Sequence, residues 1–183
     1  MTQVKKNSIF VLIFIILLVI GIIIFSYVFL EDPYPGICLN SVDREMTELK
    51  LAIEDSVSRM EYPPLIFRPE GSCFTSSNKF GLIIYLEKTR LVCAQVCGAS
   101  TDECYIMKYS SDLSGSLKRK CLNLPPFTTF EVGNSCSNQN LITSGYAIIN
   151  PTVQGQLLVG QYLIRNVSPA GAPYPKLCFW HKE

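Results

Sequence analysis

Eight cysteines constrain this chain more than any other feature, because all of them lie between residues 38 and 178 and their number is even. An even set confined to one part of a chain is typical of a disulfide framework, which forms in oxidising compartments. Eight cysteines can pair in about a hundred ways, and their spacing does not choose among these. We expect disulfide bonds among Cys38, Cys73, Cys93, Cys97, Cys104, Cys121, Cys136 and Cys178.

A short repeat suggests one pairing. Residues 33–38, Pro-Tyr-Pro-Gly-Ile-Cys, recur as Pro-Tyr-Pro-Lys-Leu-Cys at 173–178, and each copy places a cysteine three residues after its second proline. Such pieces favour extended polyproline II geometry. We hypothesise that Cys38 bonds to Cys178; the alternative is that the repeat is a coincidence.

A zinc site is the other interpretation of the cysteines. Cys93, Cys97 and Cys104 lie close together, with Cys121 beyond them, but structural zinc prefers C-x2-C knuckles or paired histidines. The only histidine is His181, close to the end of the sequence. The spacing therefore favours disulfides, and we predict no metal site and no cofactor.

Residues 9–30 form an apolar run without a single charge. As a helix with a rise of about 1.5 Å per residue, this run is long enough to cross a hydrocarbon core of about 30 Å. Lys5 and Lys6 precede it, whereas Glu31 and Asp32 follow it, which predicts a cytoplasmic N-terminus. A cleavable signal would be shorter and end in small residues, so we predict a retained signal anchor.

This interpretation divides the chain into four parts: a cytoplasmic N-terminus at 1–8, a transmembrane helix at 9–30, a linker at 31–40 and an extracytoplasmic domain at 41–183. The predicted localisation is a single-pass membrane protein with its C-terminal domain outside the cytoplasm. The formal net charge is only +1, so no charge field would attract nucleic acid, and the basic run at 118–120 is typical of a solvated turn.

The outer domain begins with a helical pattern. Between residues 41 and 61, apolar residues recur at spacings of three and four, which places them on one face of a helix. Tyr62-Pro63-Pro64 ends the pattern, since proline disfavours the helical conformation in the preceding residue. We expect this face to pack on a sheet of its own domain; the alternative is that it also packs on neighbouring copies.

After Pro64 the pattern changes to short apolar segments separated by turn residues, which predicts strands. The fold class we predict is α+β: a transmembrane helix, a Pro/Gly linker and an amphipathic helix on a mostly antiparallel, disulfide-bonded sheet. The expected strands are 65–67, 80–87, 90–96, 105–109, 128–132, 146–149 and 156–165.

Motifs for catalysis are missing from the sequence. It contains no G-x-S-x-G, H-E-x-x-H, P-loop, G-x-G-x-x-G or C-x-x-C pattern, and its one histidine is expected at a frayed end. Asp102 and Glu103 are adjacent on a polar loop and are expected to be solvated. We assign no catalytic residue; Asn166, in Asn-Val-Ser, is a candidate N-glycosylation site that Pro169 disfavours.

The order of parts, a Lys-containing leader, an apolar helix, an amphipathic helix and a disulfide-bonded head, resembles type IV pilins and related surface-filament subunits. It is also similar in layout to small anchored surface proteins of archaea and envelope proteins of large viruses. The pilin resemblance implies leader removal near residues 5–10 and bundling of helices from Ile9 onward. The glutamate that pilins carry early in the apolar stretch is absent here.

We therefore expect a non-enzymatic, membrane-anchored surface or structural protein. Its partners would be the membrane, through residues 9–30, and copies of itself or another surface protein, as for a pilin-like filament subunit. One alternative is a subunit of a viral envelope complex. The other is an anchored module that binds a small molecule or glycan through exposed aromatics, namely Tyr34, Tyr62, Tyr174 and Trp180.

Overall fold

The structure is a computed structural model that describes residues 16–21, 35–59, 63–69, 80–111 and 117–183. The chain divides into two compact units, Met1–Pro35 and Gly36–Glu183. The second unit holds the helices and strands that follow, and its fold is α+β with two sheets.

Helix α2 spans Pro35–Ser58. It begins six residues before the predicted start, because a proline fits the first turn of a helix, where its missing N–H would have no partner anyway. Of the predicted apolar face, Val42, Met46, Leu49 and Ile53 are fully buried and Val57 is partly buried. Met60, its last predicted member, lies outside the described residues. The buried residues share one core with inward-facing residues of both sheets, as expected for a helix that packs on its own domain.

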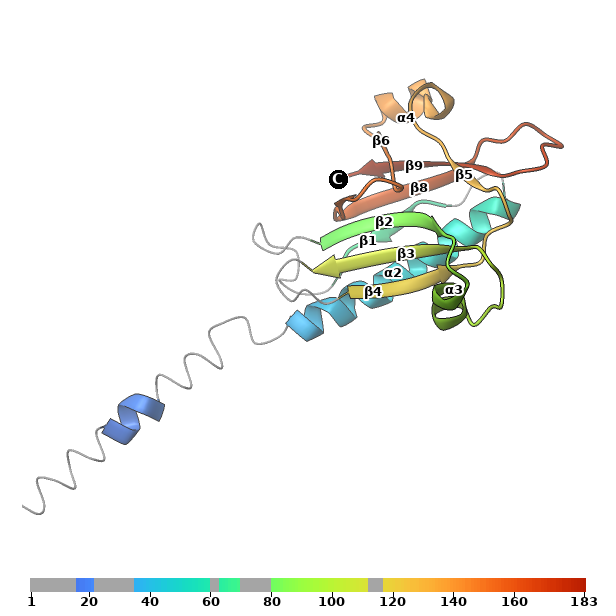
Figure 1. Ribbon diagram of the computed structural model, residues 1–183. Helices are drawn as coiled ribbons and strands as arrows, with labels where there is room; N and C mark the ends of the chain where they lie inside the picture. The colour runs from blue at the N-terminus through green and yellow to red at the C-terminus, as the bar shows by residue number, and fades with distance from the viewer. Residues whose placement is uncertain (1–15, 22–34, 60–62, 70–79, 112–116) are drawn as a thin grey trace, which may run out of the picture. The chain divides into compact units, whose positions relative to one another are not determined.

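A four-stranded antiparallel sheet has the order β4-β3-β2-β7. The strands are β2 (Phe80–Glu87), β3 (Cys104–Ser111), β4 (Leu117–Leu122) and β7 (Gly155–Gln156). Side chains alternate along β3: Tyr105, Met107 and Tyr109 belong to the core beneath α2, whereas Cys104 and Ile106 face the opposite side. Figure 1 shows α2 running along the strands of this sheet.

The five-stranded sheet is built around its last strand. The strands are β1 (Leu65–Phe67), β5 (Thr129–Phe130), β6 (Ala147–Ile149), β8 (Gly160–Asn166) and β9 (Lys176–Lys182). β9 pairs with β8 along one side, and with β6 and, in parallel, β5 along the other. A strand in this central position is buried on both faces, and five consecutive residues of β9 are buried.

Short helices cover the outer faces of the sheets. α3 (Arg90–Cys97) packs against the outer side of β3, through a cluster that includes Cys93 and Ile106. η2 (Gly133–Cys136) precedes α4 (Gln139–Thr143), and Cys136 and Leu141 pack with Trp180 on the outer side of β9. The domain is therefore layered, with α2 on the inner faces and the short helices outside.

The predicted transmembrane helix is contradicted. Among the residues that the structure describes, no helix is long and apolar enough to cross a membrane. Of residues 9–30, only 16–21 are among the described residues. The predicted fold class is wrong in this part, and the single-pass localisation, which depended on it, is not supported either.

One strand prediction and two predictions of irregular structure also need correction. Residues 90–96 form α3 rather than a strand, because a short apolar segment has no periodicity that separates the two. The basic run at 118–120, predicted as a solvated turn, lies in β4. The end of the sequence, 179–183, was expected to fray, but residues 179–182 belong to the buried strand β9.

Candidate functional site

The predicted disulfides are confirmed for six of the eight cysteines. Cys93 bonds to Cys104, Cys97 to Cys121, and Cys136 to Cys178, with Cα–Cα separations of 5.7, 5.0 and 5.5 Å. Cys93 and Cys97 lie one turn apart on α3, so one short helix is tied to both β3 and β4. Cys73 and the side chain of Cys38 lie outside the described residues.

These bonds decide between the interpretations of the cysteines. The hypothesis that Cys38 pairs with Cys178 is wrong, since Cys178 pairs with Cys136. The four cysteines of the zinc alternative form two disulfides, so they offer no thiolate ligands to a metal. Within the described part of the chain, no three His, Cys, Asp or Glu side chains are grouped so that they could hold a metal.

His181, the one imidazole, is a core residue rather than a residue at a frayed end. It is only 4 % exposed in β9, its Nε2 lies 3.0 Å from the C=O of Val159, and its ring packs on Tyr162. No described side chain that could act as a nucleophile is hydrogen-bonded to this ring. The arrangement positions β8 against β9.

The strongest cluster of charges joins α2 to the four-stranded sheet. Tyr109 donates a hydrogen bond to Asp43, and the Nζ of Lys120 lies 3.0 Å from the same carboxylate. Burial raises the pKa of Asp43, but Tyr109, Lys120 and Lys118 outweigh this and hold the pKa below its ordinary value. Burial, with the Asp43 charge, raises the pKa of Tyr109 far above its usual range. Tyr109 is fully buried, so this cluster stabilises the fold and offers no site to a substrate.

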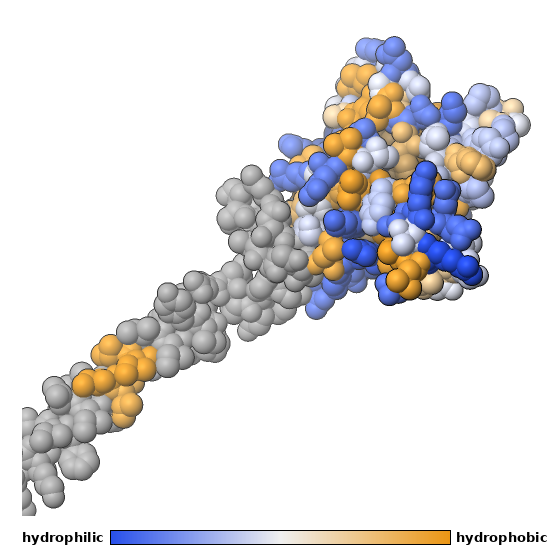
Figure 2. All heavy atoms as spheres, viewed as in Figure 1, coloured by the Kyte–Doolittle hydropathy of each residue, from blue (hydrophilic) through white to orange (hydrophobic). Residues whose placement is uncertain are grey.

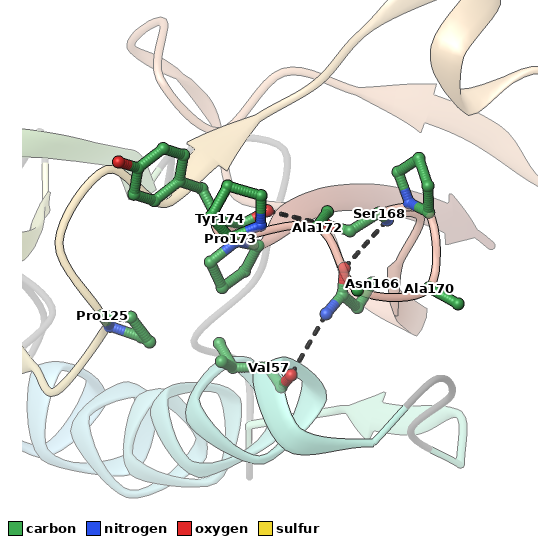
Figure 3. Close-up of a pocket in the computed structure, with 11 residues that line it drawn as sticks. Val57, Pro125, Asn166, Ser168, Ala170, Ala172, Pro173 and Tyr174 are labelled. Carbon is green, nitrogen blue, oxygen red and sulfur yellow. Dashed lines mark hydrogen bonds between the residues drawn. The ribbon is translucent and has the colours of Figure 1, made fainter.

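Asn166, the candidate glycosylation site, lies at the end of β8 beside the end of α2. Its Nδ2 donates to the C=O of Val57 at 3.1 Å, and its Oδ1 accepts from the N–H of Ser168 at 3.0 Å. Figure 3 shows the side chain of Asn166 turned toward Val57, in a hollow of about 310 Å³ bordered by Pro125 and Pro173. Both polar atoms of the amide are thus occupied within the fold, and glycosylation stays a prediction.

The four aromatics predicted as a binding surface do not gather into one. Trp180 is 1 % exposed in the core, whereas Tyr174 is 48 % exposed. Tyr34 and Tyr62 lie outside the described residues. Trp180 therefore cannot contact a ligand in this conformation.

Phe127, which the sequence analysis did not select, has the most unusual conformation among the described residues. It is the only one of them other than glycine with a positive φ, +62°, and its side chain is 66 % exposed. The N–H of Thr128 donates to the C=O of Pro125 at 3.3 Å, which closes a turn with Pro126 and Phe127 at its corner. Turns with a positive φ at the third position usually place glycine there.

Hydrogen bonds hold this turn in place. The hydroxyl of Thr128 donates to the C=O of Pro125 at 2.7 Å, and the hydroxyl of Tyr105 donates to the C=O of Thr128 at 2.7 Å. The ring of Phe127 also contacts the ring of Tyr174 edge-on, with centroids 5.0 Å apart. The turn is therefore fixed to β3, and Phe127 is presented on a rigid support.

Two hollows flank Phe127. One, of about 440 Å³, extends along the end of the four-stranded sheet past the Cys97–Cys121 bond. The other, of about 490 Å³, lies between β2 and β5. Leu86, Tyr105 and Phe127 border both, so the hollows adjoin each other. We call this surface, with the two hollows and these three shared residues, the Phe127 groove.

The groove is suited to binding rather than to chemistry. Among the residues that line it, Glu103 is the only one with a charged side chain, and most of the others are apolar. On the face drawn in Figure 2, apolar residues form patches among polar ones. Exposed apolar surface with a hollow beside it is typical of interaction sites.

Comparisons with known proteins do not change this assessment. No family model, no curated protein and no solved structure matches the chain. The function must be argued from the residues of the domain itself.

Proposed function

We propose that the domain is a non-enzymatic recognition module that binds a protein partner through the Phe127 groove. The observation that carries the proposal is the conformation of Phe127. A bulky residue at positive φ costs about 1–2 kcal/mol, and here that cost is not offset by burial of the ring. Strained residues that are held in place by their surroundings cluster at functional sites.

The chemistry around Phe127 supports a protein as the partner. Aromatic side chains at the centre of an interface contribute most of the binding energy when a surrounding rim excludes water. Two adjoining apolar hollows beside an exposed ring provide such a centre. The three disulfides indicate that the domain works in an oxidising environment, where it encounters its partner in the bridged form.

Self-assembly through the helical face of α2, one form of the expected function, has no support in the described residues. The apolar face of α2 is buried in the core of its own domain and is not free for neighbouring copies. An interaction site must therefore lie elsewhere on the domain, and the Phe127 groove is the surface we assign to it.

The test compares two exposed apolar residues. A partner captured by the oxidised full chain is purified, and its dissociation constant is measured for the parent protein, for Phe127→Gly and for Leu91→Ala. Leu91, on α3, is 67 % exposed, about the same as Phe127, and does not line the groove. We expect Phe127→Gly to weaken binding about 30-fold, as for a central aromatic, and Leu91→Ala to change it less than about threefold. Equal effects of the two changes would contradict the proposal.

A further inference from the structure

The second half of β2 has an edge that no described strand occupies. β7 pairs with β2 only at Gly81 and Leu82. Farther along, the N–H of Ile84 donates to the C=O of Pro151 at 2.7 Å. Because backbone groups of an antiparallel strand point alternately to its two sides, the N–H and C=O of Leu86 point to the same side as those of Ile84. Among the described residues, no backbone group pairs with Leu86 there.

A second backbone edge faces this one across the groove. The N–H of Thr129 donates to the C=O of Pro175, just before β9, at 3.0 Å, and the N–H of Glu131 donates to the C=O of Leu177 in β9 at 2.8 Å. By the same alternation, the N–H and C=O of Phe130, between them, point away from β9. The C=O of Thr128, on that same side, accepts from Tyr105 of β3. The hollow of about 490 Å³ thus has β2 along one border and β5 along the other.

The dimensions of the groove suit a short extended segment. Beyond Ile84, whose N–H is already bonded to Pro151, residues 85–87 cover about 7 Å at about 3.3 Å per residue, which is room for two or three residues of an added strand that pair at Leu86. Successive side chains of such a segment point to opposite sides, so alternate residues can enter the apolar hollows beside Phe127.

Charge distinguishes this edge from the other free edge of the same sheet. β4, the outermost strand, carries Lys118, Arg119 and Lys120, and charged residues on an edge discourage pairing with other chains. Ile84–Leu86 of β2 has no charge, and the carboxylate of Glu87, which ends the strand, accepts from the N–H groups of Lys88 and Thr89. Native edges without such protection are often covered or used.

The groove also favours a partner segment with a positive charge. Glu103 is exposed at the border of the groove, and no described cation lies within ion-pair distance of it. A basic side chain on the guest would complement this carboxylate, whereas an acidic one would be repelled.

We infer that the Phe127 groove receives an extended segment of a partner protein. The segment pairs with the free edge of β2 as an added strand, places apolar side chains in the hollows beside Phe127, and carries a Lys or Arg that faces Glu103. This inference rests on the proposed function and specifies the form of the partner.

The experiment uses the oxidised full chain and a displayed library of random nine-residue peptides. Peptides are selected on the parent protein after removal of those that also bind Phe127→Gly. The selected peptide is then synthesised with one backbone amide N-methylated at a time. A peptide that adds to β2 should lose at least tenfold in affinity when the one amide that donates to the C=O of Leu86 is methylated. It should lose less than threefold when either neighbouring amide is methylated, because those amides point away from β2.

Amide hydrogen exchange locates the new bond in the protein. We expect exchange at Leu86 to slow at least tenfold when the peptide binds. Exchange at Tyr85, whose N–H faces β3, serves as the internal control and should not change. Glu103→Gln should weaken the peptide about two- to fivefold at low salt, whereas Asp102→Asn, at the neighbouring exposed acid, should not.

Each other outcome overturns the inference. If the peptides depend on Phe127 but tolerate methylation at every position, strand addition is refuted and the proposed function survives. If no peptide depends on Phe127, both are refuted. If Leu86 becomes protected in the protein alone as its concentration rises, the occupant is a second copy of this chain rather than a partner segment.

Discussion

Replacing Phe127 with glycine should leave the stability of the domain nearly unchanged. The change relieves a left-handed conformation that costs about 1–2 kcal/mol in a residue with a Cβ. Against this stand the lost edge-on contact with Tyr174, about 0.5–1.5 kcal/mol, and the greater freedom of glycine in the unfolded chain, about 0.5–1 kcal/mol. These contributions nearly cancel, so we expect the free energy of unfolding to change by less than about 1 kcal/mol.

Phe130, three residues along the same segment, is the matched control. Its ring packs edge-on against Tyr105 and at 5.8 Å from the ring of Phe179 in the core. Phe130 is only partly buried, so Phe130→Ala should cost about 2 kcal/mol, somewhat less than for a fully buried aromatic. Phe127→Ala should be about 1 kcal/mol less stable than Phe127→Gly. Both changes lose the ring, but alanine keeps the strain of about 1–2 kcal/mol, which exceeds the cost of about 0.5–1 kcal/mol from the freedom of glycine.

The assay is urea unfolding of the oxidised protein, followed by the fluorescence of Trp180. This residue is the only tryptophan of the chain and is buried in β9, so its emission reports loss of the core. If Phe127→Gly costs as much as Phe130→Ala, the ring of Phe127 is a structural element. The argument that its conformation is maintained for binding would then fail.

Three further substitutions, and Gly98→Ala as a control, test the fold of the domain by urea unfolding. Gly160→Ala should cost more than about 3 kcal/mol, because φ is +144° and a Cβ would lie 2.2 Å from a backbone oxygen, whereas Gly98→Ala, with open space, should cost about 1 kcal/mol. Asp43→Asn should cost about 1–2 kcal/mol at pH 7, and the difference from the parent should vanish as the pH falls below about 4. Asn166→Gln, made in unglycosylated protein, should cost about 1 kcal/mol through its lost bond to α2.

The outcomes that would contradict these predictions are equally specific. Equal costs for the two glycine changes would show that the strands move apart without penalty. The pH dependence of Asp43 has a definite sign: its folded pKa is lowered, so its contribution is present above the unfolded pKa and is lost as the carboxylate is protonated. A difference that grows in acid would refute it. A neutral Asn166→Gln would show that the bond to Val57 contributes nothing.

Periodicity predicted the parts of this fold where one face is buried. The spacing of Val42, Met46, Leu49 and Ile53 identified the buried face of α2, and the predicted strand 80–87 coincides with β2. Where burial is not one-sided, the pattern disappears. β9 is buried on both sides, so the residues around Trp180 show no alternation and were taken for a terminus.

The candidate site was predicted least well, for a physical reason. Pro125-Pro126 indicates a turn, but the sequence rule for a positive φ after proline expects glycine. Phe127 breaks that rule. The hydrogen bonds that hold the turn come from Thr128, its neighbour, and from Tyr105, which is distant in sequence, and a local pattern does not show the second of these. The groove likewise depends on β2 and β5 lying side by side, which no local pattern encodes.

The order of strands in the five-stranded sheet determines which parts of the domain can fold first during synthesis. β9 is the strand with which β5, β6 and β8 all pair, yet it is the last of them to leave the ribosome. Until residues 176–182 emerge, these three strands have no common partner, and Cys136 must wait as a free thiol for Cys178. The α3 disulfides can close much earlier, since their partners follow within 11 and 24 residues. A nascent chain halted before β9 would therefore expose Cys136 to mispairing, and a disulfide isomerase would act chiefly on that late bond.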